Sequence, residues 1–466
     1  EIKSIDYSKQ IEESVDKLRM PINDGKIQLE GCKVLETLSS SSESIHFFCD
    51  LDVIPVLIRT MRARNRDSRF QASATNILRN ISGDATARDL VFRNNGIENI
   101  AKSMLNFPDH EDVQENSCFC LQYYIESEEA VTRMLRSNCF ELICQCMNKF
   151  QNNAELQTAA LLLLCVIASY DGAKKSALVS RDVVSRAIQN CVDRAPEPLL
   201  AASMTMIDFM ADRKECIKLL LVPHVLQVLL DAMETYDNVE IRLHGACIMA
   251  TLANLEPSSH KLLIEVESYA TMITMINACD KVKAIRNSCF SYFVAIFQDH
   301  DNSVELCNKG ILPYFVSGIE NRHNEKLLSY LNVLVAVFQH EMSMKIVANC
   351  GVLDKLLEVL QNNADNADVI ATGLHLLYNV MLTSSIIPAA VQMGYLSALT
   401  WCAESYADSK EVCLWVMQVM VRMATCPSVR AQMIASHCVE TVFKMKTLFY
   451  DDKEFPGHVC QLLSNL

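Results

Sequence analysis

The segment CNKGILPYFVSGIE (Cys307–Glu320) has a counterpart in ANCGVLDKLLEVL (Ala348–Leu360), roughly forty residues further along the chain. Each segment passes through a glycine and continues into an apolar pattern. After Gly351 the apolar residues keep the i, i+3, i+4, i+7 spacing of one face of an amphipathic helix: Leu353, Leu356, Leu357 and Leu360. Glycine favours a sharp turn between two helices, because it adopts positive φ without steric cost. The two segments therefore predict a helical repeat.

The same glycine step recurs at Gly96, Gly310 and Gly394, and it is degenerate where Asp52, Cys139 and Pro223 stand near it. A polar break such as QNNADNAD follows each of these helices, and a longer apolar helix comes next. Asn, Asp and Pro are expected there, since they end one helix and cap another. Repeats of about 42 residues, about eleven in all, start near Glu43, Ala85, Glu129, Ala173, Lys214, Pro257, Asp299, Glu341, Ser385 and Pro427.

A three-helix repeat of this length resembles the armadillo-repeat family, and the resemblance covers nearly the whole chain. It rests on the G-[IV]-[LE] helix openings and on small residues that open the long helices, in EGCKVLETL, ASATNILRNISG and HGACIMATLANL. The resemblance implies an all-α fold, a right-handed superhelical α-solenoid of about eleven armadillo-type repeats. We expect one solenoid over residues 1–466, with an incomplete N-terminal repeat or cap at 1–42 and a C-terminal capping repeat at 427–466.

Composition limits the functional classes. The net charge of −14 argues against general nucleic-acid binding, which needs a basic excess, and it would steer basic partners toward the chain. The longest apolar run is only about ten residues, so no membrane span of about twenty is expected. The 20 cysteines are scattered through apolar helices without a C-x-x-C pair, which predicts reduced, buried thiols. A cytoplasmic location follows, with a nuclear or cytoskeleton-associated one as the alternative.

No catalytic or cofactor motif is present in the sequence. The patterns G-x-x-x-x-G-K, G-x-G-x-x-G and H-E-x-x-H are all missing. The cysteine groups 118/120 and 139/144/146 lack the paired spacing that a zinc site uses. We therefore expect a protein that is not an enzyme and that holds neither a metal nor a cofactor.

The resemblance also implies candidate binding residues. In armadillo proteins the third helices line a concave face, and importin-α-like members carry a Trp there, followed four residues later by an Asn that holds a peptide backbone. Asn80, Asn254 and Asn379 match that Asn, but Asn76, Ala250 and His375 stand at the Trp position. A nuclear-signal groove is therefore not supported. Asn76 and the three matching asparagines are candidates for partner contact, with hydrogen bonds between repeats as the alternative.

Two further features complete the set of candidates. The segment RTMRARNRDSRF places five arginines around one predicted loop, where they could hold carboxylates or phosphates: Arg59, Arg62, Arg64, Arg66 and Arg69. Gln122 and Tyr123 lie on the predicted third helix of the next repeat, and tyrosine is a favoured contact residue. An ordinary solvated loop and ordinary helix packing are the respective alternatives.

These features together predict a protein-interaction scaffold or adaptor that presents a concave groove to an extended or helical segment of a partner protein. Three alternatives stay open. The chain could be a chaperone for client proteins, a component of a cytoskeletal or ciliary assembly, or the regulatory armadillo region of a larger signalling protein. The last is retained because the sequence begins at Glu1 and not at methionine.

Overall fold

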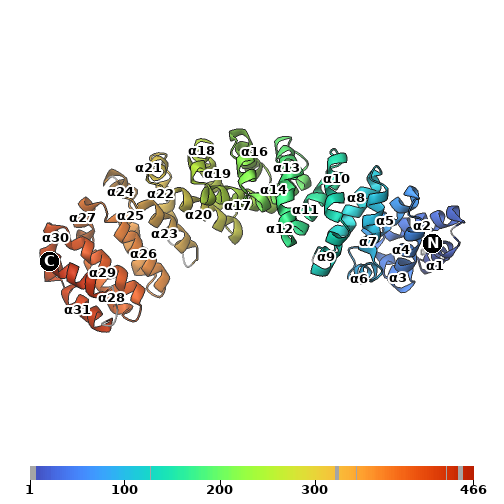
Figure 1. The fold of residues 1–466 in the computed structure, drawn as a ribbon. Helices are drawn as coiled ribbons and strands as arrows, with labels where there is room; N and C mark the ends of the chain where they lie inside the picture. Colours follow the sequence, from blue (N-terminus) through green and yellow to red (C-terminus); the bar gives the residue numbers. More distant parts are fainter. Residues whose placement is uncertain are drawn as a thin grey trace, which may run out of the picture. The chain divides into compact units, whose positions relative to one another are not determined.

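A computed structural model of the chain describes residues 7–21, 23–125, 127–320, 325–342, 344–436, 438–449 and 455–466. The described residues form helices and no strand, which confirms the predicted all-α class (Figure 1). The chain divides into two compact units, unit 1 (Glu1–Ile248) and unit 2 (Met249–Leu466). No single described helix is long and apolar enough to span a membrane. Two bent pairs of helices reach that length and composition only when the two helices of a pair are taken together. These pairs are Lys214–Leu220 with Pro223–Thr235 and Ala367–Val380 with Ser384–Gln392.

Helices of three kinds alternate along the chain. The short first helices of unit 1 are η1 (Ser42–Ser44) with α3 (Ile45–Asp50), α6 (Ala85–Arg93), α9 (Glu128–Arg136), α12 (Gly172–Ser180) and α15 (Lys214–Leu220). Those of unit 2 are η2 (Pro257–Ser259) with α18 (His260–Glu265), α21 (His300–Asn308), α24 (Met344–Cys350), η3 (Ser384–Ile386) with α27 (Ile387–Gln392), and α30 (Pro427–Ala435). They begin within a few residues of the repeat starts expected from the sequence.

The second helices of unit 1 are α1 (Tyr7–Arg19), α4 (Val53–Ala63), α7 (Gly96–Asn106), α10 (Cys139–Lys149), α13 (Val183–Val192) and α16 (Pro223–Thr235). Those of unit 2 are α19 (Ser268–Ala278), α22 (Leu312–Gly318), α25 (Val352–Asn362), α28 (Tyr395–Ser405) and α31 (Cys438–Leu448).

The third helices are on average the longest. Those of unit 1 are α2 (Gly25–Ser39), α5 (Ser68–Ile81), α8 (Glu111–Gln122), α11 (Ala154–Tyr170) and α14 (Glu197–Met210). The helix α17 (Val239–Leu255) contains the boundary between the units, and unit 2 continues with α20 (Lys283–Ile296), α23 (Glu325–Phe338), α26 (Ala367–Val380), α29 (Lys410–Ala424) and α32 (Phe455–Asn465). Polar side chains cap several of them, as when the Asn153 carboxamide oxygen accepts from the Leu156 amide at 2.8 Å.

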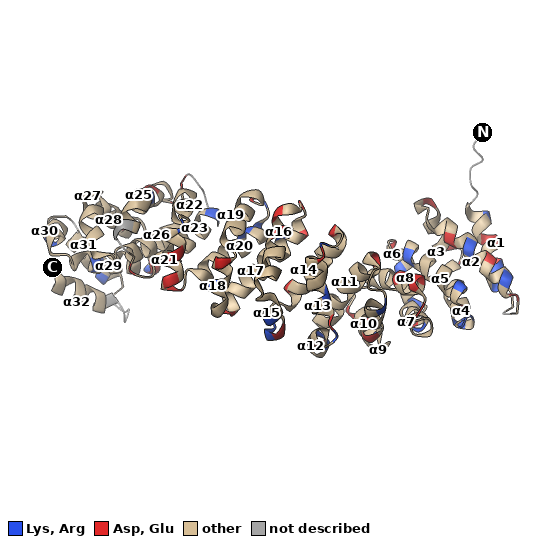
Figure 2. Cartoon of the chain, turned by 90° about the horizontal axis from the view of Figure 1, so that it is seen from above, with Lys and Arg blue, Asp and Glu red and all other residues tan. Residues whose placement is uncertain are grey.

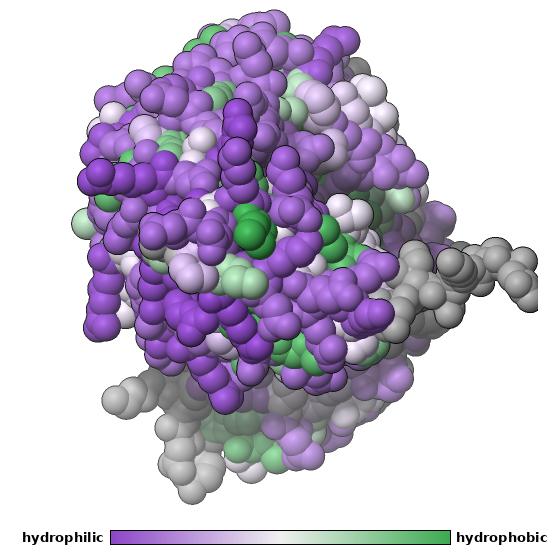
Figure 3. Space-filling view, turned by 90° about the vertical axis from the view of Figure 1, so that its right-hand side faces the viewer, coloured by the Kyte–Doolittle hydropathy of each residue, from purple (hydrophilic) through white to green (hydrophobic). Residues whose placement is uncertain are grey.

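Packing joins like helices of successive repeats. In unit 1 the third helices α2, α5, α8, α11 and α14 contact one another in order, and the second helices α1, α4, α7 and α10 do the same (Figure 1). In unit 2 the third helices α20, α23, α26, α29 and α32 are likewise packed in order. One repeat cannot bury its own apolar face, so each interior face is covered by the next repeat. At the α1–α2 end the surface is largely hydrophilic, as a terminal repeat requires (Figure 3).

The turn between first and second helices needs one residue in the left-handed conformation. Glycine fills this position at Gly310, Gly351 and Gly394, where φ is +84°, +67° and +99°. Gly96 has a different role from the one predicted, because the preceding Asn95 takes the positive φ of 58°. A Cβ at Gly96 would collide with the Val91 side chain and lie 2.8 Å from the Val91 carbonyl oxygen. Gly96 therefore permits close approach and not the turn itself.

The degenerate repeats solve the same turn with other residues. Asp52, Asn138, Asp182 and Glu267 have φ between 55° and 60° there. The predicted step at Cys139 is thus one residue too late, and at Pro223 the preceding Val222 is extended with no left-handed residue. Asn and Asp tolerate this conformation better than other residues with a Cβ, whereas glutamate has no such advantage. Glu267 is therefore the most strained of these positions.

Buried glutamines fix where the first four third helices of unit 1, α2, α5, α8 and α11, begin. Gln114 Nε2 donates to the carbonyl oxygens of Met104 and Phe107, at 2.8 and 2.9 Å, which end the second helix α7. Gln28, Gln71 and Gln157 make the equivalent bonds to the ends of α1, α4 and α10. The last carbonyls of a helix have no partner inside it, so these amides satisfy groups that would otherwise be buried unpaired.

We expect Gln114→Leu to lower the free energy of unfolding by about 1–3 kcal/mol, because it leaves two carbonyl oxygens without their amide donor. Urea denaturation followed by circular dichroism measures the change. The matched control is Gln145→Leu, which makes the same substitution at an exposed position of α10 and should change little. Equal effects of the two substitutions would show that the carbonyls do not depend on the amide.

We expect Glu267→Gly to raise the free energy of unfolding by roughly 0.5–1 kcal/mol, because glycine removes the strain of positive φ and this gain exceeds its added chain entropy. Gly351→Ala is the reverse change at the equivalent turn and should be destabilising by a similar amount. Denaturation midpoints of both variants test this. A stabilising Gly351→Ala would contradict the role assigned to the turn.

Candidate interaction surfaces

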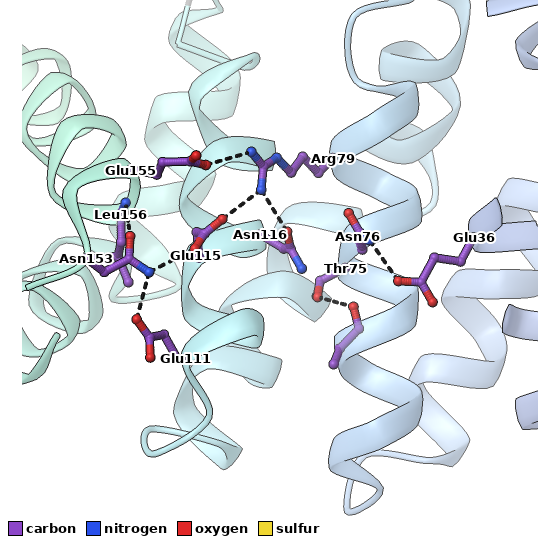
Figure 4. Close-up of polar contacts among 11 residues, drawn as sticks. Glu36, Thr75, Asn76, Arg79, Glu111, Glu115, Asn116, Asn153, Glu155 and Leu156 are labelled. Atoms are coloured by element: carbon purple, nitrogen blue, oxygen red, sulfur yellow. Dashed lines mark hydrogen bonds and ion pairs between the residues drawn. The ribbon is translucent and has the colours of Figure 1, made fainter. Parts of the chain in front are cut away.

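Arg79 links the third helices of three successive repeats. From α5 its Nη1 donates to Glu115 Oε1 (2.8 Å) and Asn116 Oδ1 (3.2 Å) on α8, and its Nη2 to Glu155 Oε2 (3.3 Å) on α11 (Figure 4). The guanidinium also lies over the Phe119 ring, 4.0 Å from the centroid. Arg79 was not among the candidate residues predicted from the sequence. The feature that could have identified it is its position three residues after Asn76, which places a basic side chain on the same face of the helix.

The surface around Arg79 is acidic. Asn153 Nδ2 donates to Glu111 Oε1 and Glu115 Oε2, both at 2.8 Å, and Asn76 Nδ2 donates to Glu36 Oε1 at 2.7 Å (Figure 4). Together these contacts contain four carboxylates and one guanidinium: Glu36, Glu111, Glu115 and Glu155 against Arg79. Their formal charge is therefore −3. This network, which we name the acidic row, runs across α2, α5, α8 and α11.

The four candidate asparagines mostly bind neighbouring repeats. Asn76 belongs to the acidic row, and Asn80 Nδ2 donates to Ser39 Oγ on α2 at 2.9 Å. Asn379 is buried, and its Nδ2 donates to the Val335 carbonyl oxygen on α23 at 3.1 Å. Asn254 is exposed, donates to Ala250 O and Ser291 Oγ, and lines a hollow of about 620 Å³. The amide donors of all four are thus engaged within the fold.

Tyr123 stands between two surface hollows at the C-terminal end of α8. One hollow, of about 350 Å³, is also lined by Asp89, Phe92 and Tyr124, and the other, of about 320 Å³, by Phe119 and Gln122. Arg88 lines both. The Tyr123 side chain is 46% exposed. The structure therefore places Gln122 and Tyr123 at one hollow, beside the Phe119 ring over which Arg79 lies.

The five candidate arginines do not share one environment. Arg64 is half-buried, and it donates to Gln28 Oε1 at 2.5 Å and to Asp67 Oδ2 at 2.7 Å. Arg62 donates to Asn99 Oδ1 on α7 at 3.2 Å and to the carbonyl oxygen of Asn94, which ends α6, at 2.5 Å. Arg59, Arg66 and Arg69 are exposed, and they lie in α4, in the turn after α4 and in the first turn of α5, respectively. Arg64 consequently acts in packing the turn.

The cysteines are mostly buried thiols in apolar surroundings. Cys118 Sγ lies 3.8 Å from Cys146 Sγ in the core, and that contact and burial hold the pKa of Cys118 well above its ordinary value. Burial likewise raises the pKa of Cys144 to about 12. Thiolates are the form that binds zinc or attacks an electrophile, so these thiols are in the unreactive form. Within the described ranges no group of three His, Cys, Asp or Glu side chains could hold a metal.

Unit 2 carries an aromatic cluster on its third helices. The His375 ring on α26 stacks on the Trp415 ring on α29, with centroids 4.1 Å apart and planes at 15°, and Tyr378 lies 6.0 Å from Trp415. All three side chains are half-buried. His375 was noted in the sequence only as a replacement for tryptophan. Trp415 comes from the next repeat, so the stacking depends on how α26 and α29 pack.

Burial lowers the pKa of His375 below its ordinary value of about 6.5. The unfolded chain then binds the proton at higher pH than the folded chain, so this histidine reduces stability as pH falls through the ordinary value. In Trp401→Phe, the Trp415 fluorescence should be quenched by protonated His375 only below pH 6.5. His375→Gln should abolish that transition. A midpoint at or above 6.5 would contradict the burial of the ring.

Comparison with known proteins agrees with this architecture. Residues 10–190 match the family model described as the LRRK2 ARM repeat. An engineered protein is 18% identical, with 98% of each chain covered and a TM-score of 0.50. A second structure comes from work on a phosphorylation switch that controls the interaction between cadherin and beta-catenin. It is 12% identical over 99% of this chain and 92% of that one, with a TM-score of 0.74. No curated protein matches the sequence. Residues 10–190 thus match an armadillo-repeat family model, and the whole chain has the fold of an armadillo solenoid.

Proposed function

We propose that this chain is a non-enzymatic adaptor, and that the third-helix face of unit 1 binds an extended, basic segment of a partner protein. The armadillo fold supports a protein-interaction scaffold in general. The observation that carries the finer proposal is the position of Tyr123 between two hollows, at the C-terminal end of α8, the helix that carries Glu111 and Glu115 of the acidic row.

The charge of the acidic row supports a basic partner. Arg79 neutralises only one of four carboxylates, and the Glu155 side chain is still 67% exposed. Lysine or arginine side chains of a partner would complete this charge balance, and complementary fields raise the association rate and exclude acidic competitors. An isolated exposed ion pair contributes only about 0–1 kcal/mol, so the row favours selectivity more than affinity.

Tyr123 and the two hollows beside it are the proposed source of the binding affinity. Tyrosine buries a large, rigid surface with little entropy loss, and such residues dominate binding when their surroundings exclude water. A segment that lies across α8 would place apolar side chains in the hollows while its basic residues reach Glu111 and Glu155. Such a segment crosses several third helices, so an extended conformation fits better than a single helix.

The proposal assigns no catalytic step. Armadillo solenoids are typically non-catalytic, and the thiols whose pKa is raised by burial are poor nucleophiles. The many free, buried cysteines support a reducing compartment such as the cytoplasm. No particular contact favours the chaperone, cytoskeletal or signalling-region alternatives over the adaptor.

Affinity capture from lysate with quantitative cross-linking mass spectrometry tests the adaptor. The variant Glu111→Lys/Tyr123→Ala/Glu155→Lys changes exposed positions only, and partner recovery should fall by about 30-fold or more, since a hot-spot tyrosine alone contributes about 2 kcal/mol. The matched control is Glu215→Lys/Phe443→Ala/Glu265→Lys, whose aromatic residue is 47% exposed. Cross-links to α8 and α11 that disappear only in the first variant are expected. Equal recovery with both variants would reject the third-helix face.

A further inference from the structure

A ridge of basic side chains runs along the second helix α4 of unit 1. Arg59 and Arg62 are exposed and lie three residues apart, so they share one side of the helix. Arg66 is exposed in the turn that follows, and blue Lys and Arg positions mark α4 and its neighbours in Figure 2. The opposite side of α4 is buried, with Leu57 and Met61 inaccessible to solvent. The ridge therefore faces away from the core.

Arg62 is held in place and extends the ridge to the next repeat. Its Nε donates to Asn99 Oδ1 at 3.2 Å, and its Nη2 to the Asn94 carbonyl oxygen at 2.5 Å. Asn99 in turn donates to the Asn95 carbonyl oxygen at 2.6 Å. These bonds position the guanidinium over the start of α7. Lys102 follows Asn99 by three residues on that helix and is exposed.

The ridge is positive because its acidic neighbours are already engaged. Among the residues that the structure describes, no carboxylate forms an ion pair with Arg59, Arg62, Arg66 or Lys102. Three carboxylates on the adjoining segments pair with other arginines: Asp67 with Arg64, Asp89 with Arg93, and Glu98 with Arg133. Four unpaired cations therefore gather in a chain whose net charge is −14. Such a local field attracts negative groups.

An apolar side chain lies beside these cations. Leu105 on α7 is 63% exposed, the highest value for any large apolar side chain in the described part of the chain. It follows Lys102 by three residues and thus shares its side of the helix. An exposed leucine beside a cation offers an apolar contact to a partner, and the positive charge favours a partner of negative charge.

We propose that Arg59, Arg62, Arg66, Lys102 and Leu105 form a second interaction surface, the arginine–leucine patch, which binds an acidic protein segment. In that segment carboxylates flank an apolar side chain. The guanidinium forks of Arg59 and Arg66 bind carboxylates through paired hydrogen bonds, Arg62 and Lys102 add positive charge, and Leu105 contacts the apolar residue. The patch lies on second helices, so it is separate from the third-helix face proposed above. Either proposal can therefore fail without the other.

The observations favour a protein segment over other anions. A nucleic-acid surface depends on a basic excess across the domain, whereas this chain is acidic overall. Membrane binding needs a larger apolar area than one leucine, together with basic residues. Four cations around one apolar side chain match a short acidic stretch with one apolar anchor.

Fluorescence anisotropy with a labelled peptide, in which Asp and Glu residues flank a central Leu-Phe pair, tests the proposal. Saturable binding is expected at low ionic strength, weakening as salt approaches about 0.15 M. Arg59→Gln/Arg66→Gln/Lys102→Gln should weaken it about tenfold or more, and Leu105→Ser should weaken it roughly threefold without changing the salt dependence. Arg62 is left unchanged because it also holds α7. Lys214→Gln/Lys218→Gln/Lys281→Gln removes the same charge at other exposed sites and should bind as wild type.

Four results would overturn the proposal. The first is binding that the patch variant leaves unaffected while its melting curve shows a folded protein, and the second is an equal fall with the control variant, which indicates general charge attraction. The third is binding of a single-stranded oligonucleotide or of phosphatidylserine vesicles through these residues when the peptide does not bind. The variant Glu111→Lys/Tyr123→Ala/Glu155→Lys should bind the acidic peptide at least as well as wild type. A loss there would place the peptide on the third-helix face instead.

Discussion

The free carbonyl groups at the end of each second helix set the geometry of unit 1. They have no partner inside their own helix, and they lie where the third helix covers them, so something in the third helix must donate to them. Gln114 and Gln157 donate to carbonyls ten and seven residues earlier, which fixes where each third helix starts relative to the second. Leu200 occupies the equivalent position one repeat later and has no donor to give. There Arg194 adopts φ of 52°, and the turn satisfies the carbonyls with its own amides, as when Ala195 N donates to Asn190 O.

Contacts between repeats draw on the same kinds of side chain that a partner would use. Asn80 and Asn379 bind the preceding repeat, and Tyr395 donates to the Leu353 carbonyl oxygen at 2.6 Å across 42 residues. A polar group that holds two repeats together is no longer available to a ligand unless binding replaces the bond. Tyr123 with its hollows, and Arg59 and Arg66 on and after α4, are exposed and are not used in this way.

Unit 1 carries two surfaces of opposite charge, which the net charge of the chain does not reveal. Carboxylates collect on the third helices around Arg79, and cations collect on the second helices around Arg62. Helices of the two kinds belong to opposite sides of each repeat, so the fields need not cancel at contact distance, given a screening length of about 8 Å at physiological salt. An adaptor with two such faces could hold a basic and an acidic segment at the same time. That arrangement is a physical basis for bridging two partners.

The amino-acid sequence by itself determined the repeat, because apolar spacing within about 42 residues is local and each repeat must bury the same face. It also located the polar breaks, and it predicted Gln122 and Tyr123 as candidates for partner contact. Only the tertiary structure decided which polar residues are engaged. Arg79 donates a hydrogen bond to Glu155, 76 residues further along the chain, and Arg64 donates to Gln28 and Asp67. Trp415 stacks on His375 from the adjacent repeat. Side-chain pairing between repeats depends on register and packing angle, and neither is encoded in the spacing of one helix face.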